Sequence, residues 1–439
     1  MITISKSLIG GILIIYKAIY AMLLFVNVLS CYLAANTMIS STLFFLILAA
    51  ITIGVVAMAR VSFISLFSVF LFYPVLSVFY QSIYHHSYGI LELVSKRNIL
   101  PLYTKTFYMS YSIAISVVLL VVIFTDFLIK EAAVFQKKIA MNTLSYTSFS
   151  IAAMLTALIA FPTIPFQYNS EMRFHALLPG NSWNMLTIIL LLFIIRSKQQ
   201  YLIGKISIIF VSFWFLSHFE RVDIIGFFLC FLSLFLIHKR GKWTIQSILV
   251  FSFMIPSFLM VSAIIGESRT GNQLTSGGFL KKILVQNTAT DVAYVYNITI
   301  DYIKSHGYFY ITGFFQMIHD IFHNIFGGQR FTAILDANYA FPGGNYFLTP
   351  GYSFLGYTGI VIYTSLFFLF LYGVLFFDNG FMQMVYIFLL SYIPRIVWYG
   401  VDFTYTGLQL YIPVLYLVLK FLNTETPFSK FPVKGSRHE

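Results

Sequence analysis

The sequence predicts an all-α, polytopic integral membrane protein, and three observations predict it. Hydrophobic residues make up 59% of the 439-residue chain and charged residues only 10%, whereas soluble domains are about 45–50% apolar and about 25% charged. The mean hydropathy is +0.85. The apolar runs are continuous and do not alternate as barrel strands do. Because backbone amides in lipid must be satisfied within their own segment, these runs are expected to be helices.

Twelve apolar runs are candidate spans, since crossing the hydrocarbon core takes about 20 residues per helix. They cover 10–34, 40–59, 61–83, 106–129, 146–166, 183–197, 201–218, 222–238, 243–265, 350–377, 381–399 and 404–422. The first run is too long for a signal peptide, so we interpret it as a retained span. The predicted organisation is nine spans in 1–265, a long polar loop in 266–349, three spans in 350–423 and a tail in 424–439.

Orientation follows from the basic residues of the short loops. Placing both termini in the cytoplasm puts most of these residues inside, as membrane proteins require. The net charge of +12 is then explained without a nucleic-acid partner. The long loop lies on the outer side, where Arg forms a larger share of the basic residues. Because guanidinium groups bind phosphate or carboxylate in bidentate fashion, an anionic partner is expected on that face.

Three outer loops each combine an arginine with an acidic residue. They read Glu171-Met-Arg173-Phe-His175, His218-Phe-Glu220-Arg221-Val-Asp223 and Gly266-Glu267-Ser-Arg269. One interpretation is that each arginine forms a solvated local ion pair of small energetic value. The other is a convergent cationic pocket for a pyrophosphate, built by Arg173, Arg221 and Arg269.

Two further arginines are weaker candidates for the same pocket. Arg330 follows the flexible pair Gly327-Gly328, where backbone can approach a ligand. Arg395 follows Pro394 near the outer end of the eleventh span. A charge at that depth is usually functional or paired, and Asp402 is the partner that the sequence offers.

The long loop contains a helical pattern over Ile311–Phe326, with apolar residues at intervals of three and four. His319 and His323 lie on the polar face of this predicted helix. That face either is exposed to water or covers a catalytic cleft. Two histidines four residues apart could share a metal, but neither a third ligand nor a zincin pattern is visible, so no metal and no cofactor are predicted.

Three stretches carry a resemblance to a known family. They are Glu220-Arg221-Val-Asp223, Ser268-Arg269-Thr-Gly271, and the run from Gly343 to Gly359 that enters the tenth span. With the spans and the late outer loop, they resemble the Wzy-type O-antigen (oligosaccharide repeat-unit) polymerases. In the last stretch Asn345, Gly356 and Gly359 match the pattern of the wider polymerase and ligase group, while Gly344 stands where that group has His.

The resemblance implies a GT-C-like membrane glycosyltransferase of the bacterial inner membrane, acting on its periplasmic face. It would join oligosaccharides linked to undecaprenyl pyrophosphate, with that carrier as leaving group. Glu267, Glu171, His319 and His323 have the chemistry of a general base. The implied partners are the lipid-linked oligosaccharides, membrane lipid, a chain-length-determining co-polymerase and a flippase, with no nucleic acid.

Three other classes remain open. A lipid-linked oligosaccharide flippase or other transporter would show related halves and a polar path through the bundle, with more charges inside the spans. An O-antigen ligase would use a lipid A-core acceptor instead. A membrane acyltransferase is expected to have histidine near the cytoplasmic side or the membrane plane rather than arginine on the outer side.

Overall fold

The computed structural model describes residues 6–59, 62–84, 103–162, 165, 182–218, 220, 222–238, 288–310, 331–339, 344–377 and 379–423. Within these ranges the regular structure is helical, and the one β-type contact is an isolated parallel bridge between Ile139 and Ser197. The chain forms two compact units. Unit 1 is drawn from Met1–Lys137 and Phe219–Tyr405, and unit 2 from Lys138–His218 and Thr406–Glu439.

Unit 1 holds eleven α-helices and one 3₁₀ helix among the described residues. They are α1 (Lys6–Ala35), α2 (Ser41–Ala59), α3 (Phe63–Tyr84), α5 (Thr104–Phe124), α6 (Phe127–Gln136), α11 (Val222–His238), α14 (Thr288–His306), α16 (Phe331–Asn338), α17 (Thr349–Phe376), α18 (Gly380–Ser391), α19 (Ile393–Tyr399) and η1 (Val401–Thr404).

Unit 2 is smaller. Its helices are α7 (Thr143–Ala160), α9 (Ser182–Arg196), α10 (Leu202–Ser217), the π-helix η2 (Gly407–Tyr411) and α20 (Ile412–Asn423). The Thr187 hydroxyl of α9 donates to the Thr156 hydroxyl of α7 at 2.9 Å. Asn142 caps α7 through the Ser145 N–H at 2.7 Å and also donates to the Leu422 carbonyl at the end of α20.

By length and composition, six described helices can cross a membrane: α1, α2, α3, α5, α7 and α17. The bent pair α18–α19 makes a seventh if it is one span. The chain is therefore a multi-pass membrane protein. The expected number of about twelve spans is not confirmed, because α9, α10, α11 and the η2–α20 pair are shorter than about 20 residues. The predicted span 243–265 lies outside the described residues.

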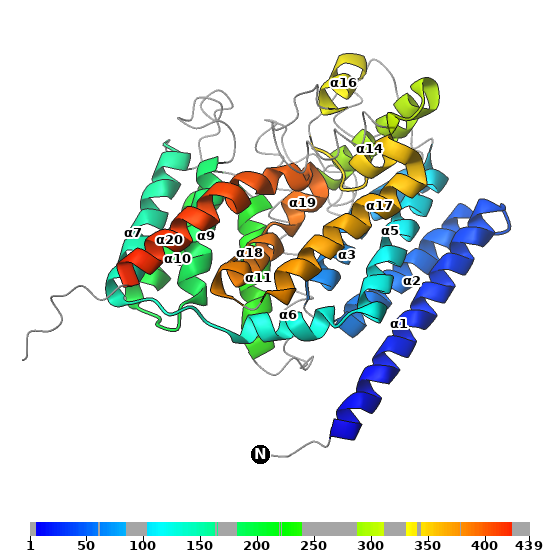
Figure 1. Ribbon diagram of the computed structural model, residues 1–439. Helices are drawn as coiled ribbons and strands as arrows, with labels where there is room; N and C mark the ends of the chain where they lie inside the picture. Colours follow the sequence, from blue (N-terminus) through cyan, green and yellow to red (C-terminus); the bar gives the residue numbers. More distant parts are fainter. Residues whose placement is uncertain are drawn as a thin grey trace, which may run out of the picture. The chain divides into compact units, whose positions relative to one another are not determined.

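The helix positions themselves follow the sequence closely. Each predicted span other than 243–265 coincides with one helix or with two consecutive helical elements. In Figure 1 the N-terminal end of α1 and helix α6 lie at one end of unit 1, and α14 and α16 lie at the other. This is the separation expected for segments on opposite sides of a membrane.

The predicted long loop contains two helices that the sequence did not indicate, α14 and α16. Helix α14 contacts α3, α17 and α19, and its consecutive residues from Val292 to Ile300 are all buried. The Ser77 and Thr290 hydroxyls join α3 to α14 at 2.8 Å. The predicted amphipathic helix over 311–326 lies outside the described residues.

Helix α17 is broken near its start, at Leu355 and Gly356. Gly356 has φ +59°, which favours glycine because a Cβ is crowded there. Gly351 and Gly359 approach so closely that a Cβ on Gly359 would lie 1.9 Å from the Gly351 carbonyl oxygen. The glycines quoted for the resemblance therefore mark where the continuous part of the helix begins.

Asn27 fixes α1 against α5. Its side-chain amide donates to the Ser112 carbonyl at 2.7 Å and to the Ser116 hydroxyl at 2.9 Å, and it accepts from the Ser112 hydroxyl at 3.0 Å. Asn27 is fully buried, whereas Phe25 on the same helix is 67% exposed. Helix α1 thus combines an outward apolar surface with one polar anchor.

Candidate functional site

Arg395 is the one predicted site residue that lies within the described part of the chain. The others fall outside it: Glu171, Arg173, Arg221, Glu267, Arg269, His319, His323 and Arg330. Their predicted roles therefore stay predictions. Glu220 and Val222, the neighbours of Arg221 in the sequence, are described.

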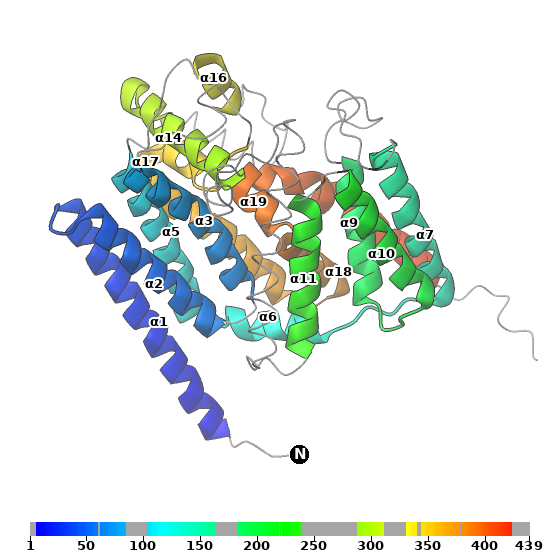
Figure 2. The same cartoon turned by 180° about the vertical axis from the view of Figure 1, so that it is seen from behind.

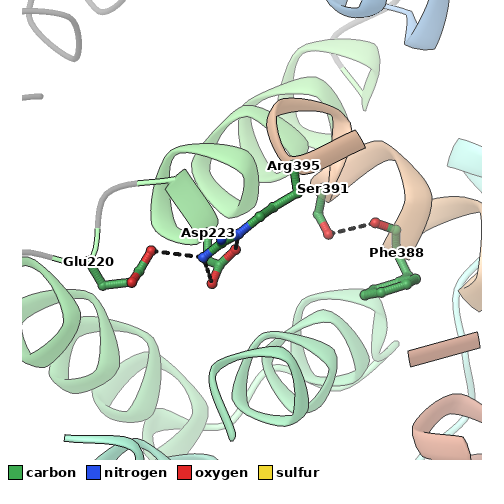
Figure 3. Close-up of polar contacts among 5 residues, drawn as sticks. All are labelled: Glu220, Asp223, Phe388, Ser391 and Arg395. Atoms are coloured by element: carbon green, nitrogen blue, oxygen red, sulfur yellow. Dashed lines mark hydrogen bonds and ion pairs between the residues drawn. The ribbon is translucent and has the colours of Figure 1, made fainter. Parts of the chain in front are cut away.

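Arg395 is the third residue of α19, directly after a bend. Helices α18 and α19 meet at an angle of 58°. Pro394 lies at the start of α19, where its missing N–H costs least and its fixed φ suits a new helix. On the α18 side the Ser391 hydroxyl donates to the Phe388 carbonyl at 2.8 Å. The bend directs the first turn of α19 towards α11 (Figure 3).

The guanidinium of Arg395 joins two carboxylates from α11 and the residues before it. Its Nε donates to Asp223 Oδ1 at 2.6 Å and its Nη2 to Asp223 Oδ2 at 3.0 Å. The same Nη2 donates to Glu220 Oε1 at 3.2 Å. Figure 3 shows Glu220 and Asp223 on the same side of Arg395. The Asp223 contact is the two-point fork that makes Arg–carboxylate pairs strong.

A glycine on α11 makes this approach possible. Gly226 lies three residues after Asp223, and therefore on the same face of the helix. A Cβ at Gly226 would lie 1.9 Å from the Ser391 carbonyl oxygen and 3.4 Å from Pro394 Cδ. Only hydrogen in place of a side chain lets α11 lie against the bend. Figure 2 shows α11 running from the level of α19 to that of α6.

The three charged residues are withdrawn from water. Arg395 is 5% exposed, and Glu220 and Asp223 are each 1% exposed. The guanidinium carbon also lies 5.0 Å from the ring centre of Tyr399, a favourable cation–π distance. Buried charges of this kind are tolerated because they are paired, and removal of one partner is costly.

The other end of α19 is joined to the stretch quoted for the resemblance. The Asn345 N–H donates to the Trp398 carbonyl at 3.0 Å, and the Phe347 N–H donates to the Val397 carbonyl at 2.9 Å. These bonds satisfy carbonyls that a helix end leaves open. Helix α19 therefore connects Glu220 and Asp223 at its start with Asn345 at its end.

Asn345 and Thr349 each present a buried polar atom. Asn345 is 8% exposed and Thr349 fully buried. Within the described ranges, Asn345 Oδ1 and Thr349 Oγ1 have no hydrogen-bond partner. Atoms of this kind call for an explanation in a native structure.

A second buried carboxyl, Glu131, lies on α6 at the other end of unit 1. Its Oε1 accepts from the Phe63 N–H at 2.7 Å and from the Tyr386 hydroxyl at 2.6 Å. Neither donor carries a charge. Burial raises the pKa of Glu131 to about 7, although both hydrogen bonds act to lower it.

The geometry gives Arg395 two partners, Glu220 and Asp223, that the sequence did not assign to it, and its pairing with Asp402 stays a prediction. The side chain of Asp402 lies outside the described part of the chain, whereas Glu220 and Asp223 are in contact. Three guanidinium N–H donors already point at carboxylates. The arrangement is suited to holding the first turn of α11, and with it the backbone on both sides of Arg221.

The sequence does contain a signal for this network, which is the presence of charged residues in apolar segments. Asp223 lies at the start of an apolar helix, and Arg395 lies in an apolar run, so each charge required a partner at that depth.

Among the described residues, no group of three His, Cys, Asp or Glu side chains could hold a metal ion.

No protein-family model, curated protein or solved structure matches this chain.

Proposed function

We propose that this protein is an O-antigen polymerase, a GT-C-like glycosyltransferase of the bacterial inner membrane with about twelve spans and a long periplasmic loop. It joins oligosaccharide repeat units linked to undecaprenyl pyrophosphate. The observation that carries the proposal is the meeting at α19 of two stretches that carry the resemblance, 220–223 and 343–359. They are far apart in sequence, and residues of both contact this one short helix.

In the proposed reaction, a hydroxyl of the acceptor repeat unit attacks the anomeric carbon of the donor glycan. The bond between that carbon and the pyrophosphate oxygen breaks, and undecaprenyl pyrophosphate leaves with the electron pair. A base takes the hydroxyl proton, and Glu267, Glu171, His319 and His323 are the candidates. Negative charge grows on the phosphate oxygens, and fixed guanidinium groups stabilise it without reorganising.

Arg173, Arg221 and Arg269 are the proposed pyrophosphate contacts, with Arg330 as a further candidate. Arg395 has a positioning role in this proposal, because its guanidinium already binds both carboxylates that flank Arg221. A loss of Arg395 would act on the reaction through α11 rather than through the phosphate.

Polymerisation by the purified protein tests the proposal. The assay uses lipid-linked repeat unit and follows the growth of the glycan. We expect Arg221→Ala and Arg269→Ala to lose most activity, and the Lys replacements to lose it as well because a bidentate contact is removed. Lys105→Ala is the matched control, since Lys105 is a half-buried cation of the predicted outer side whose ammonium donates to the Ala35 carbonyl. Wild-type rates in both arginine variants would contradict the pyrophosphate site.

The deletion phenotype separates the proposed function from its rivals. Without a polymerase, the lipopolysaccharide core carries one repeat unit. Loss of a ligase leaves bare core with polymer on its carrier, and loss of a flippase leaves bare core with no polymer. Either of the last two results would replace the polymerase proposal.

A further inference from the structure

The residues that follow α14, Gly307–Tyr310, expose two tyrosines to solvent. Tyr308 is 39% exposed and Tyr310 is 59% exposed. Gly307 has φ +82° and Tyr310 has φ +43°. A positive φ is uncommon for a residue with a bulky side chain, and such strain is concentrated at functional sites. We call Gly307–Tyr310 the tyrosine segment.

The tyrosine segment is held in place from both sides. The Phe309 N–H donates to the Ser353 carbonyl of α17 at 3.1 Å. The Tyr308 hydroxyl lies over the break in α17, where a Cβ on Gly356 would approach it to 2.7 Å. The Phe309 ring stacks on Tyr302 of α14 at 6.0 Å. The exposed rings are therefore presented by a fixed backbone.

The helix end behind the segment is also fixed, by Asp301. The Tyr103 hydroxyl donates to Asp301 Oδ1 at 2.7 Å, and the Tyr339 hydroxyl donates to Asp301 Oδ2 at 2.8 Å. Burial, together with the bond to Asp301, raises the pKa of Tyr103 to about 12. Tyr103 thus remains a hydrogen-bond donor at every physiological pH, and α14, α16 and the start of α5 stay joined.

The exposed rings form an angled surface. Tyr308 and Tyr310 have ring centres 6.2 Å apart at an interplanar angle of 77°. Behind them the buried ring of Tyr352 lies 6.3 Å from that of Tyr308 at 69°. The residues just before them, Lys304, Ser305 and His306, are all exposed and polar. Lysine and a solvated helix end are unfavourable against hydrocarbon, so these rings face water rather than lipid tails.

We propose that Tyr308 and Tyr310 form a carbohydrate-binding subsite that stacks against a pyranose ring of the lipid-linked oligosaccharide. A pyranose offers an apolar C–H face and a rim of hydroxyls. A tyrosine offers an apolar ring and a polar tip, so both halves of the sugar surface are matched. This inference rests on the proposed function and adds to it a place for the glycan at the break of α17.

Binding of the free glycan tests the subsite without requiring catalysis. The probe is the repeat-unit oligosaccharide released from its carrier by mild acid. Its saturation-transfer NMR signal is measured on the purified full-length protein in detergent. We expect saturable binding by the wild type. Loss of one aromatic contact, in Tyr308→Ala or Tyr310→Asn, should weaken binding roughly three- to tenfold.

The choice of asparagine at position 310 and two further variants make the test specific. Asparagine tolerates the left-handed backbone at position 310, so Tyr310→Asn removes the ring without adding strain. Tyr310→Phe keeps the ring and should retain most of the binding. Tyr32→Ala is the matched control, because Tyr32 is a similarly exposed tyrosine on α1 at 61%. Each variant must keep the wild-type melting temperature to be compared.

The outcomes separate this inference from the proposed function. No saturable binding by the wild type, or equal binding by Tyr308→Ala, Tyr310→Asn and wild type, would overturn the subsite even if the protein polymerises. Tyrosine-dependent binding by a protein that does not polymerise supports the subsite and contradicts the polymerase.

Discussion

Among its described residues, unit 1 buries acidic side chains at two places and satisfies them by opposite means. At the α19 bend, Asp223 and Glu220 are held by the cation Arg395. On α6, Glu131 is held by two neutral donors, Phe63 N–H and the Tyr386 hydroxyl. The first site keeps its charges and depends on all of them. The second accommodates its carboxyl best when that group is protonated, because burial penalises the ion.

The two sites also fix the same pair of helices. Tyr386 belongs to α18 and Arg395 to the first turn of α19, so each helix of the bent pair is attached once. The comparison predicts that substitutions at the charged site cost more.

Replacement of Arg395 should have the largest effect. In Arg395→Met two buried carboxylates lose their cation, and we expect a loss of about 3–5 kcal/mol in the free energy of unfolding. Denaturation in detergent micelles measures it. Adding Asp223→Asn and Glu220→Gln should recover much of the loss, because no uncompensated charge remains. Equal stability of Arg395→Met and wild type would show that the network is not ionised as drawn.

The pH dependence of stability should come next. The pKa of Glu131 rises from 4.5 to about 7 on folding, so between these values the folded state holds a proton that the unfolded chain has released. The contribution of Glu131 to stability is therefore greatest below pH 4.5 and falls by about 3 kcal/mol as the pH rises to 7. Unfolding curves at pH 5 and pH 8 measure this fall, which Glu131→Gln should largely remove.

A matched control for Glu131→Gln is Asp126→Asn, at the start of the same helix. The Asp126 side chain is 46% exposed, so this variant removes a carboxyl of the same helix without removing a buried one. If the free energy of unfolding depends on pH equally in Glu131→Gln and in the wild type, the proposed difference in charge between the Glu131 site and the Arg395 site is wrong.

Gly226→Ala tests the approach of α11 to the bend. Its Cβ would overlap the Ser391 carbonyl, and forced overpacking of this kind costs about 1–3 kcal/mol. Gly373→Ala in α17 is the control, because nothing lies within 4 Å of its Cβ position. That substitution should stabilise the helix by about 0.5–1 kcal/mol. A change in the free energy of unfolding of the same sign in both variants would contradict the close packing of α11 against the bend.

Tyr386→Phe should have the smallest effect. It removes one neutral hydrogen bond to Glu131, which is worth about 1 kcal/mol. Because that bond lowers the pKa of Glu131, its loss should move the end of the stability decline to higher pH. Unfolding curves of the variant between pH 6 and 9 measure the shift, with Tyr372→Phe as a control on an exposed hydroxyl.

The positions of most helices could be predicted from the sequence because a segment that lies in lipid must consist of apolar residues. The runs at 40–59 and 61–83 match α2 and α3 to within two residues at each end. Helix α14 was not predicted, because Thr290, Asn297 and Thr299 break its apolar pattern. These residues are buried by neighbouring helices rather than by lipid, and their hydroxyl and amide groups bind within the protein.

The network at α19 was predictable only in part. The sequence indicated that Arg395 needed a partner and that Glu220 and Asp223 lay near an arginine. It could not indicate that Arg395 and Asp223, 172 positions apart, would meet, because that contact depends on how α18 bends and how closely Gly226 lets α11 approach. Neither property leaves a local pattern.

Asn27 has a consequence for how the first helix sits in the bilayer. Its amide is fully used by Ser112 and Ser116, and turning α1 about its axis would carry that amide into hydrocarbon with nothing to bind. Helix–helix hydrogen bonds of this kind are individually modest, about 1 kcal/mol. Acting together, the three bonds of Asn27 select the rotational setting of α1, and so decide which of its faces the surrounding acyl chains touch.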